Sequence, residues 1–481
     1  MSALAYIGRE KELRLLQDLL EKKSSSLVVL KGRRRIGKSR LAEEFGRSHR
    51  FIKFSGLPPT PGITKTDQLK EFMQQLSIQT GFPDVAVDDW SKAFSLLASQ
   101  TQKGRVTILF DEISWMADDS PEFLPKLKNA WDLSLKNNPK LILILCGSIA
   151  SWIDQNILAS TGFMGRTSLC LTLEPLSIKD SSTFIKTLNP NLSPAEQLQI
   201  LSITGGIPRY LEEILPNAPA AQTILQSCFK KEGILFREFN DIFSDLFSKK
   251  SPTYIRILQA LVDGKHQFDS LCEELELEKS GSVSEYLEDL SQAGFIQKEA
   301  TWDLKSQKTA RFSQYRISDN YARFYLKFIL PNQDRIESGL FEESSLKALP
   351  NWNGIMGLQF ENLVLQNRSL IWETLRIPPG DIVMENPFFQ RPTKDSGPGC
   401  QIDYLIQTQY NTLFPCEIKF ALQSTLGLSV VQEMKEKLDA LKLPKNYSYW
   451  PVLIYVGELS EPLISAGYFK KMIDFSMFLK A

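Results

Sequence analysis

The stretch Leu27-Val-Val-Leu-Lys-Gly-Arg-Arg-Arg-Ile-Gly-Lys-Ser39 decides the fold of this chain. Its apolar start predicts a buried strand, the glycines at 32 and 37 favour a tight loop, and residues 39–45 have helical periodicity. In that order, the backbone N–H groups of the loop can cradle phosphates. We expect Lys38 to contact the β and γ phosphates and Ser39 to coordinate Mg²⁺. The stretch therefore predicts a site for a nucleoside triphosphate, ATP, with Mg²⁺.

The loop and the first helical turn supply most of the predicted nucleotide-binding residues. This set is Gly32, Arg33, Arg34, Arg35, Ile36, Gly37, Lys38, Ser39 and Arg40. The run of three arginines carries the least information, because loop arginines are usually just solvated.

Three polar residues follow two further apolar runs, where the carboxyl ends of parallel strands would meet. We expect Asp111 to hold the metal through water, and Glu112 to orient or deprotonate the attacking water. Ser148 follows the run Leu141–Cys146 and could sense the γ phosphate. Each could instead cap the N-terminus of the helix that follows it. These three residues thus predict that the nucleotide is hydrolysed as well as bound.

Two arginines are candidates to stabilise the charge of the transition state. Arg166 lies in Gly165-Arg-Thr167, and Arg209 lies in Gly206-Ile-Pro-Arg-Tyr210. They could act from a neighbouring copy of the chain or from a lid over the nucleotide. The alternative for each is an ordinary surface arginine with a structural role.

The length and charge of the chain limit its class. Its 481 residues exceed what one hydrophobic core usually organises, which predicts several domains. The 56 Lys and Arg residues balance 56 Asp and Glu residues, so any contact with DNA must be local. No apolar run approaches the roughly 18 residues of a membrane span, and the first residues lack a signal-peptide pattern. We therefore expect a cytoplasmic protein with no membrane partner.

The cysteine and histidine residues exclude several kinds of site. Six cysteines are scattered without a C-x-x-C pair, which predicts buried reduced thiols rather than disulfides or structural zinc. Only His49 and His266 occur, which excludes histidine-rich metal sites and most histidine triads. Catalysis is therefore expected to use carboxylates, lysine, arginine and metal.

The periodicity along the chain predicts a modular α/β protein. Apolar runs separated by helical patterns predict a parallel sheet wrapped by helices at the N-terminus, and strands return in the last third. Between them, three short helices and two strands follow the order of a winged helix. The predicted domains are a P-loop core at 1–175, a helical lid at 176–248, a winged helix at 249–330, a helical connector at 331–350 and an α/β domain at 351–481.

Two alternating segments of the last domain predict an acidic site. Ile402-Asp-Tyr-Leu-Ile406 and Cys416-Glu-Ile-Lys-Phe420 each read as a strand with one buried face. A symmetric turn centred on Tyr410 would place Asp403 opposite Glu417, and a divalent cation would make that pairing of like charges favourable. We expect Mg²⁺ or Mn²⁺ there, with Lys419 positioning water or stabilising phosphate charge and Glu361 as an outer carboxylate. A salt-bridged structural sheet is the alternative.

Motifs along most of the chain carry a family resemblance. They are Ile7-Gly-Arg-Glu-Lys-Glu12, Gly32–Ser39, Leu109-Phe-Asp-Glu112, Cys146-Gly-Ser148, Gly165-Arg166, Gly205-Gly-Ile-Pro-Arg-Tyr210 and Tyr315–Tyr325. With these residues the sequence resembles the archaeal-type prokaryotic ATPases of the AAA and STAND-like superfamily. The resemblance implies an AAA-like P-loop core, a lid, a winged helix and a restriction-endonuclease-like domain. In that last domain Glu361, Asp403, Glu417 and Lys419 match the PD-(D/E)xK nuclease pattern.

The expected recognition helix of the winged helix is acidic, which argues against insertion into the major groove of DNA. It carries Glu285, Glu288 and Asp289. Basic residues in and around the wing could still bind phosphates, namely Lys298, Lys305, Lys308 and Arg311. Docking to a protein or to another part of the chain is the alternative role.

Two functions of different classes follow from these motifs. The first is an ATP-hydrolysing switch coupled to a metal-dependent DNA nuclease. The second is a signalling or scaffold ATPase whose nuclease-like domain is inactive and only binds a partner. A remodelling motor, which would require a homo-oligomeric ring, is a third possibility.

Overall fold

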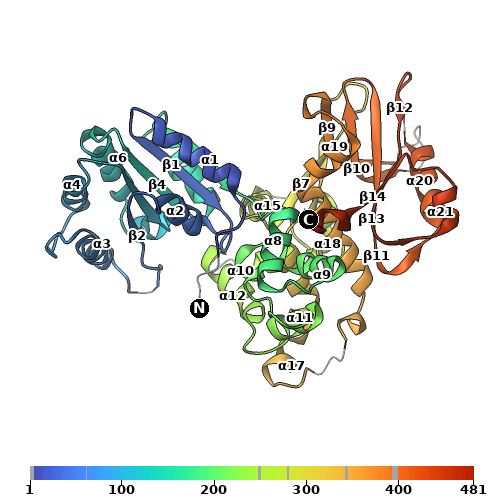
Figure 1. Cartoon of the computed structure of the whole chain (residues 1–481), viewed down its shortest axis with the longest axis horizontal. Helices are drawn as coiled ribbons and strands as arrows, with labels where there is room; N and C mark the ends of the chain where they lie inside the picture. Colours follow the sequence, from blue (N-terminus) through green and yellow to red (C-terminus); the bar gives the residue numbers. More distant parts are fainter. Residues whose placement is uncertain are drawn as a thin grey trace. The chain divides into compact units, whose positions relative to one another are not determined.

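The computed structural model describes residues 5–60, 62–247, 251–278, 281–341, 345–392, 399–441 and 443–480. It divides the chain into two compact units, residues 1–175 and 176–481 (Figure 1). Each unit has its own sheets and its own core, and each is described by itself below.

A five-stranded parallel sheet forms the centre of the first unit, in the order β2-β3-β4-β1-β5. The strands are β1 (Ser26–Gly32), β2 (Arg50–Ser55), β3 (Val106–Asp111), β4 (Leu141–Gly147) and β5 (Thr167–Leu173). The helices are α1 (Glu10–Asp18), α2 (Lys38–Gly46), α3 (Lys65–Thr80), α4 (Trp90–Gln100), α5 (Ile113–Ala117), α6 (Phe123–Leu133) and α7 (Ala150–Ile153).

Both faces of this sheet are covered by helices. α3, α4 and α6 share one hydrophobic core with alternate residues of the strands, including Leu27 and Val29 of β1. Val28 and Leu30 point the other way and are also buried, and α2 packs against the same strands. A strand buried on both sides reads as a continuous apolar run, which is why β1, β3 and β4 were predictable.

The two edge strands, β2 and β5, are missing from the sequence prediction. Buried residues alternate with half-buried or exposed ones over part of each strand, as in Phe51-Ile52-Lys53-Phe54 of β2. Such short mixed segments lack the apolar run that identifies a central strand. Cys170 lies on β5 and is exposed, whereas the other five cysteines are buried as expected.

The second unit begins with five helices and a winged helix. The helices are α8 (Ile178–Leu188), α9 (Pro194–Thr204), α10 (Pro208–Leu211), α11 (Ala220–Cys228) and α12 (Ile234–Phe247). The winged helix contains α13 (Ser251–Ala260), β6 (His266–Gln267), α14 (Phe268–Glu274), α15 (Gly281–Gln292), β7 (Ile296–Trp302) and β8 (Thr309–Ile317). Its sheet has the order β6-β8-β7, one strand more than predicted.

The rest of the second unit is a connector and a mixed sheet. The connector contains α16 (Asn320–Phe324), a π-helical turn (Tyr325–Ile329) and α17 (Gln333–Glu337). The sheet has the order β14-β13-β11-β10-β9, with β12 beside β11. The strands of this sheet are β9 (Ile382–Gln390), β10 (Cys400–Thr408), β11 (Thr412–Leu426), β12 (Ser448–Tyr449), β13 (Val452–Leu459) and β14 (Lys471–Asp474). The helices around it are α18 (Trp352–Gln366), α19 (Arg368–Leu375), α20 (Ser429–Ala440) and α21 (Glu461–Ser465). Within the described residues, no helix has the length and hydropathy that a bilayer span requires.

The wing of the winged helix packs directly onto the C-terminal sheet. Trp302 of β7 shares a core with residues of β10 and α20, and its ring meets Phe388 of β9 edge-on at 5.1 Å. Trp302 Nε1 donates a hydrogen bond to Gln407 Oε1 at 2.6 Å, and Gln407 Nε2 donates to the carbonyl of Leu304 at 2.8 Å. β7 lies beside β9 (Figure 1), and the contacts of Trp302 make the wing a structural support of the last domain.

We predict that Trp302→Phe lowers the stability of the second unit. The variant leaves the buried Gln407 oxygen without a donor, which costs about 1–3 kcal/mol. The urea midpoint followed by far-UV circular dichroism should fall. Trp450→Phe is the matched control, because Trp450 is 40% exposed. Equal midpoints for the two variants would show that the wing does not support the sheet.

Candidate functional site

The loop between β1 and α2 has the backbone geometry of a phosphate site. Gly32 has φ 146° and Gly37 has φ 90°, values that favour glycine. A Cβ atom on Gly32 would lie 2.7 Å from the carbonyl oxygen of Leu173, so only glycine fits there. Gly37 caps α2, whose first residues are Lys38 and Ser39. The loop N–H groups therefore lie at a helix N-terminus, where anions are favoured.

Lys38, Ser148 and Glu112 form a continuous chain of hydrogen bonds. Lys38 Nζ donates to the carbonyls of Gly32 and Arg33, at 2.9 and 3.1 Å, and to Ser148 Oγ at 3.0 Å. Ser148 in turn donates to the Glu112 carboxylate through its hydroxyl at 2.6 Å and its backbone N–H at 3.2 Å. The predicted phosphate contact, sensor and base are thus brought together.

The predicted magnesium residues also meet. Ser39 Oγ donates to Asp111 Oδ1 at 2.9 Å, which joins the first turn of α2 to the end of β3. A hydroxyl beside a carboxylate is a suitable oxygen donor set for Mg²⁺. Lys53 of β2 pairs with the other oxygen, Asp111 Oδ2, at 3.1 Å and also with Glu43 at 3.0 Å.

Two supporting residues, Arg9 and Lys53, are absent from the sequence prediction. Arg9 is buried and Arg9 Nη2 donates to the carbonyl of Ile36 in the loop at 3.2 Å. Its left-handed backbone, with φ 63°, is a sign of local constraint. The motif Ile7-Gly-Arg9 was a signal for it, whereas Lys53 lies on an edge strand with no motif.

Arg166 lies where β5 begins, whereas the phosphate loop follows the end of the parallel strand β1. β1 and β5 are parallel, with Leu27 opposite Thr167 and Gly32 opposite Leu173. Arg166 precedes Thr167, so about five residues of strand, roughly 16 Å along the strand axis, separate it from the loop after Gly32. Arg166 also holds Asp132 of α6 through Nε and Nη2, at 3.1 and 2.8 Å. It therefore lies away from the phosphate loop of its own chain, and its pairing with Asp132 fits the structural role given above as the alternative.

Arg209 belongs to the second unit and pairs with acidic neighbours. Its guanidinium donates to Glu212 at 3.0 Å and to Glu213 at 2.7 Å.

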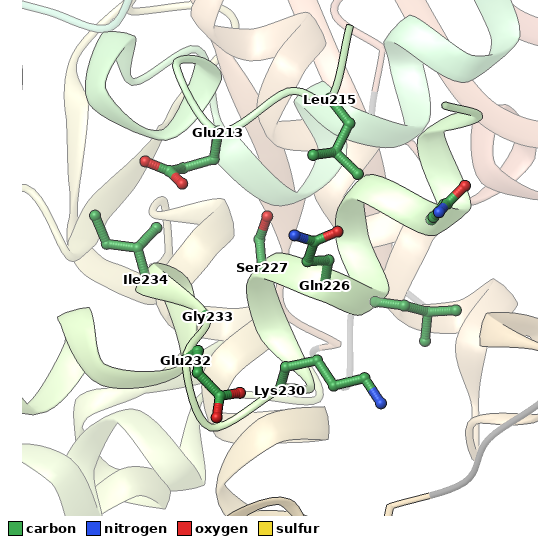
Figure 2. Close-up of a pocket in the computed structure, with 10 residues that line it drawn as sticks. Glu213, Leu215, Gln226, Ser227, Lys230, Glu232, Gly233 and Ile234 are labelled. Atoms are coloured by element: carbon green, nitrogen blue, oxygen red, sulfur yellow. The ribbon is translucent and has the colours of Figure 1, made fainter. Parts of the chain in front are cut away.

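Glu213 lines a cavity of about 470 Å³ between the α10–α11 connection, α11 and the start of α12. Figure 2 shows the side chains of Glu213, Gln226, Ser227 and Lys230 around this space. None of the predicted site residues lines it.

The hairpin of β10 and β11 places the two acidic residues as predicted. Tyr404 pairs with Cys416 and Leu405 with Pro415, a register centred on Tyr410. The same register brings Asp403 opposite Glu417, and the backbone N–H of Ile418 donates to Asp403 Oδ2 at 2.9 Å. The alternation of the two strands thus confirms the predicted juxtaposition.

A lysine that the sequence prediction omits lies between the two carboxylates. Lys437 Nζ of α20 is 2.6 Å from Glu417 Oε2 and 3.5 Å from Asp403 Oδ1. Lys419 Nζ is 2.9 Å from Glu417 Oε1 and 2.7 Å from Glu433 of α20. The five charged groups therefore alternate in sign along the face of the sheet that α20 covers.

Glu361 is paired with the winged helix. Its carboxylate receives Lys265 Nζ at 2.6 Å, and Lys265 also lies 3.7 Å from the fully buried Glu299. In the described parts of the chain, no three acidic, cysteine or histidine side chains gather to hold a metal ion. The structure therefore brings together two of the three predicted acidic residues.

Burial and the nearby charge of Glu417 raise the pKa of Asp403 to about 6. Lys437 and the backbone donor of Ile418 act in the opposite direction, and they do not cancel the effect. Burial, more than any neighbouring charge, thus makes the charged form of Asp403 costly in the folded protein.

We predict that Asp403→Asn becomes relatively more stable as the pH rises. The folded wild type binds the Asp403 proton more tightly than the unfolded chain, so its stability falls between about pH 4 and pH 6. Asparagine carries no such proton. In urea unfolding with a chelator present, the free energy of unfolding of Asp403→Asn minus that of wild type should increase by roughly 1–2 kcal/mol between about pH 5 and 7.5. Asp439→Asn, on the exposed side of α20, is the control. A difference that shrinks as the pH rises would contradict the assigned environment.

Family comparisons identify two parts of the chain. Residues 6–214 match the model of an ATPase domain found predominantly in Archaea. Residues 251–298 match the model of bacterial regulatory proteins of the arsR family.

The chain is also similar to individual proteins of Archaea. It is 28% identical over 361 residues to an uncharacterized protein of Methanocaldococcus jannaschii, covering 74% of this chain and 76% of the relative. The structure of a Walker-type ATPase of Pyrococcus abyssi matches with a TM-score of 0.54 and 21% identity, over 67% of this chain and 96% of that one. The ORC2 protein of Aeropyrum pernix matches with a TM-score of 0.43 and 13% identity, over 70% and 97%. The chain therefore carries an archaeal-type P-loop ATPase domain and, after it, a winged helix of the arsR type.

Proposed function

We propose that this protein is an ATP-hydrolysing switch whose nucleotide state controls a metal-dependent DNA nuclease site in its last domain. The placement of Asp403 opposite Glu417, with Lys419 two residues further along the same strand face, carries the nuclease assignment. It is the arrangement that phosphodiester hydrolysis needs, because two carboxylates hold the metal and an ammonium stabilises phosphate charge.

In the ATPase domain each residue has a distinct task. Lys38 and the loop N–H groups bind the phosphates, while Ser39 and Asp111 would hold Mg²⁺, which neutralises charge on the phosphate oxygens. Glu112 is the proposed base for the attacking water. Its carboxylate is occupied by Ser148, so hydrolysis requires that Ser148 release it. Arg166 would complete the site from a second copy of the chain.

The coupling to the last domain is proposed to run through α8 and α9. The backbone N–H of Ile178 donates to Asn367 Oδ1 at 2.9 Å, between α18 and α19. Ser182 Oγ donates to the carbonyl of Leu479, near the C-terminus, at 3.2 Å. A lid that responds to nucleotide would therefore move together with the acidic site. DNA would be held by the exposed wing residues Lys298, Lys305, Lys308 and Arg311.

The acidic pair has the chemistry of a metal site. Glu417 is fully buried, and its Oε1 atom faces Lys419 as an ion pair without a well-formed hydrogen bond. Asp403 Oδ1 has only a distant partner in Lys437, at 3.5 Å. Two carboxylates on facing strands, with only ammonium groups between and beside them, offer the oxygen ligands that Mg²⁺ or Mn²⁺ prefers.

A specific observation favours a second function. Lys437 already bridges the two carboxylates, and the wing is packed against the sheet rather than free. Both features fit a signalling or scaffold ATPase whose nuclease-like domain binds a partner and cleaves nothing.

We predict that Glu112→Gln separates ATP binding from ATP hydrolysis. The amide keeps the shape of the side chain but cannot accept a proton, so kcat should fall by a factor of about 10²–10⁴. Binding of a fluorescent ATP analogue should stay within a few-fold of wild type. Lys38→Ala should instead lose binding, because it removes the phosphate contact. Unchanged hydrolysis by Glu112→Gln would remove Glu112 from the mechanism.

The nuclease assignment is tested on supercoiled, linear and branched DNA with Mg²⁺ or Mn²⁺, with and without ATP. Cleavage by the wild type should fall about a hundredfold or more in Asp403→Ala and Glu417→Ala, because each removes a metal ligand. Lys38→Ala should change the ATP dependence alone. No cleavage of any DNA form by a wild type that binds ATP would favour the scaffold function.

A further inference from the structure

Lys437 occupies the position where a divalent cation would bind the acidic pair. It reaches the strands from α20, one helical turn after Glu433, which lies on the same face of the helix. Its ammonium touches Glu417 Oε2 at 2.6 Å and lies 3.5 Å from Asp403 Oδ1. An ammonium and a metal ion cannot both occupy the space between those oxygen atoms.

The local charges show that this ammonium does not fully satisfy the site. Asp403, Glu417 and Glu433 supply three negative charges, and Lys419 and Lys437 supply two positive charges. One negative charge is left over in this group, in which Glu417 is buried, Asp403 is largely buried and Glu433 is partly exposed to water. Replacement of Lys437 by a divalent ion would leave the group neutral, which is favourable where the dielectric constant is low.

Lys437 is also able to leave. A quarter of its side chain is exposed, so the ammonium can swing into water while the aliphatic stem stays against the sheet. Lys419 is tied on both sides, between Glu417 and Glu433. The side chains of Lys419 and Lys437 are exposed to a similar extent, but only Lys437 contacts both Asp403 and Glu417, whereas the second partner of Lys419 is Glu433 of α20.

We propose that Lys437 is a resident counter-ion that holds Asp403 and Glu417 together and must withdraw before a divalent cation binds. It is a positioning residue that lowers the metal affinity of the site, so the acidic pair stays closed until the cation displaces the ammonium. The inference rests on the proposed use of Asp403 and Glu417 as metal ligands.

The test measures Mn²⁺ binding by nucleotide-free protein, through the electron paramagnetic resonance signal of free Mn²⁺. Lys437→Met keeps the length of the side chain and removes its charge, so it should bind Mn²⁺ about ten- to a hundredfold more tightly than wild type. Lys437→Gln should behave in the same way, and it serves if the methionine variant does not fold. Addition of Asp403→Asn to either variant should abolish the gain.

Two controls separate competition for the site from a general charge effect. Lys435→Met removes an ammonium from the same helix, one that lies over the Tyr468 ring at 5.5 Å, and should bind Mn²⁺ as wild type does. Lys437→Arg keeps the positive charge and should also keep the affinity low. In thermal unfolding, Lys437→Met without metal should melt below wild type, and saturating Mn²⁺ should restore it.

The outcomes distinguish this inference from the proposed nuclease. Equal Mn²⁺ affinity in wild type and Lys437→Met overturns the inference, whether or not DNA is cleaved. A gain that survives Asp403→Asn also overturns it, because the metal would then bind elsewhere. A gain that depends on Asp403, in a protein that cleaves no DNA, supports the inference and removes the nuclease function alone.

Discussion

The second unit depends on the buried amide side chains of α18. Gln359 Nε2 donates to the backbone carbonyl of Asn320 at 2.6 Å, and Asn320 Nδ2 donates to the backbone carbonyl of Gln359 at 3.1 Å. Asn362 donates to the carbonyl of Ile317 at 3.1 Å. Just after α18, Asn367 receives the N–H of Ile178. Because buried polar groups without partners are costly, these bonds fix α8, the last strand of the winged helix and α16 to α18 and the residue that follows it.

This constraint gives the acidic residue Glu361 its surroundings. It lies on α18 between Gln359 and Asn362, and its carboxylate pairs with Lys265 of the winged helix. Arg316 bonds both Glu299 and Asn362 in the same buried cluster. The charge of Glu361 still contributes to the raised pKa of Asp403. One helix therefore joins the winged helix to the acidic site, through charge as well as through packing.

The sequence predicted those parts that depend on neighbouring residues along the chain. Strand β1, the loop to Ser39 and the hairpin about Tyr410 each follow from short-range periodicity and turn chemistry. Lys437 could not be predicted in its position, because its partners Asp403 and Glu417 lie on other elements and helix periodicity does not select among lysines of α20. For the same reason the sequence does not predict that the helices after residue 176 form one compact unit with the last domain. That unit depends on buried amides such as Asn367, whose partner Ile178 is over a hundred residues away. The roles of the site residues in catalysis remain predictions.

The amides of α18 also bear on how such a protein could change by recombination. A C-terminal domain attached only by a linker can be exchanged as a cassette. Here an exchange at the start of α18 would leave the backbone groups of Ile178, Ile317 and Asn320 without these buried partners. The helices from residue 176 onward and the last domain can therefore be inherited only together, even though residues up to 214 also match the ATPase-domain model.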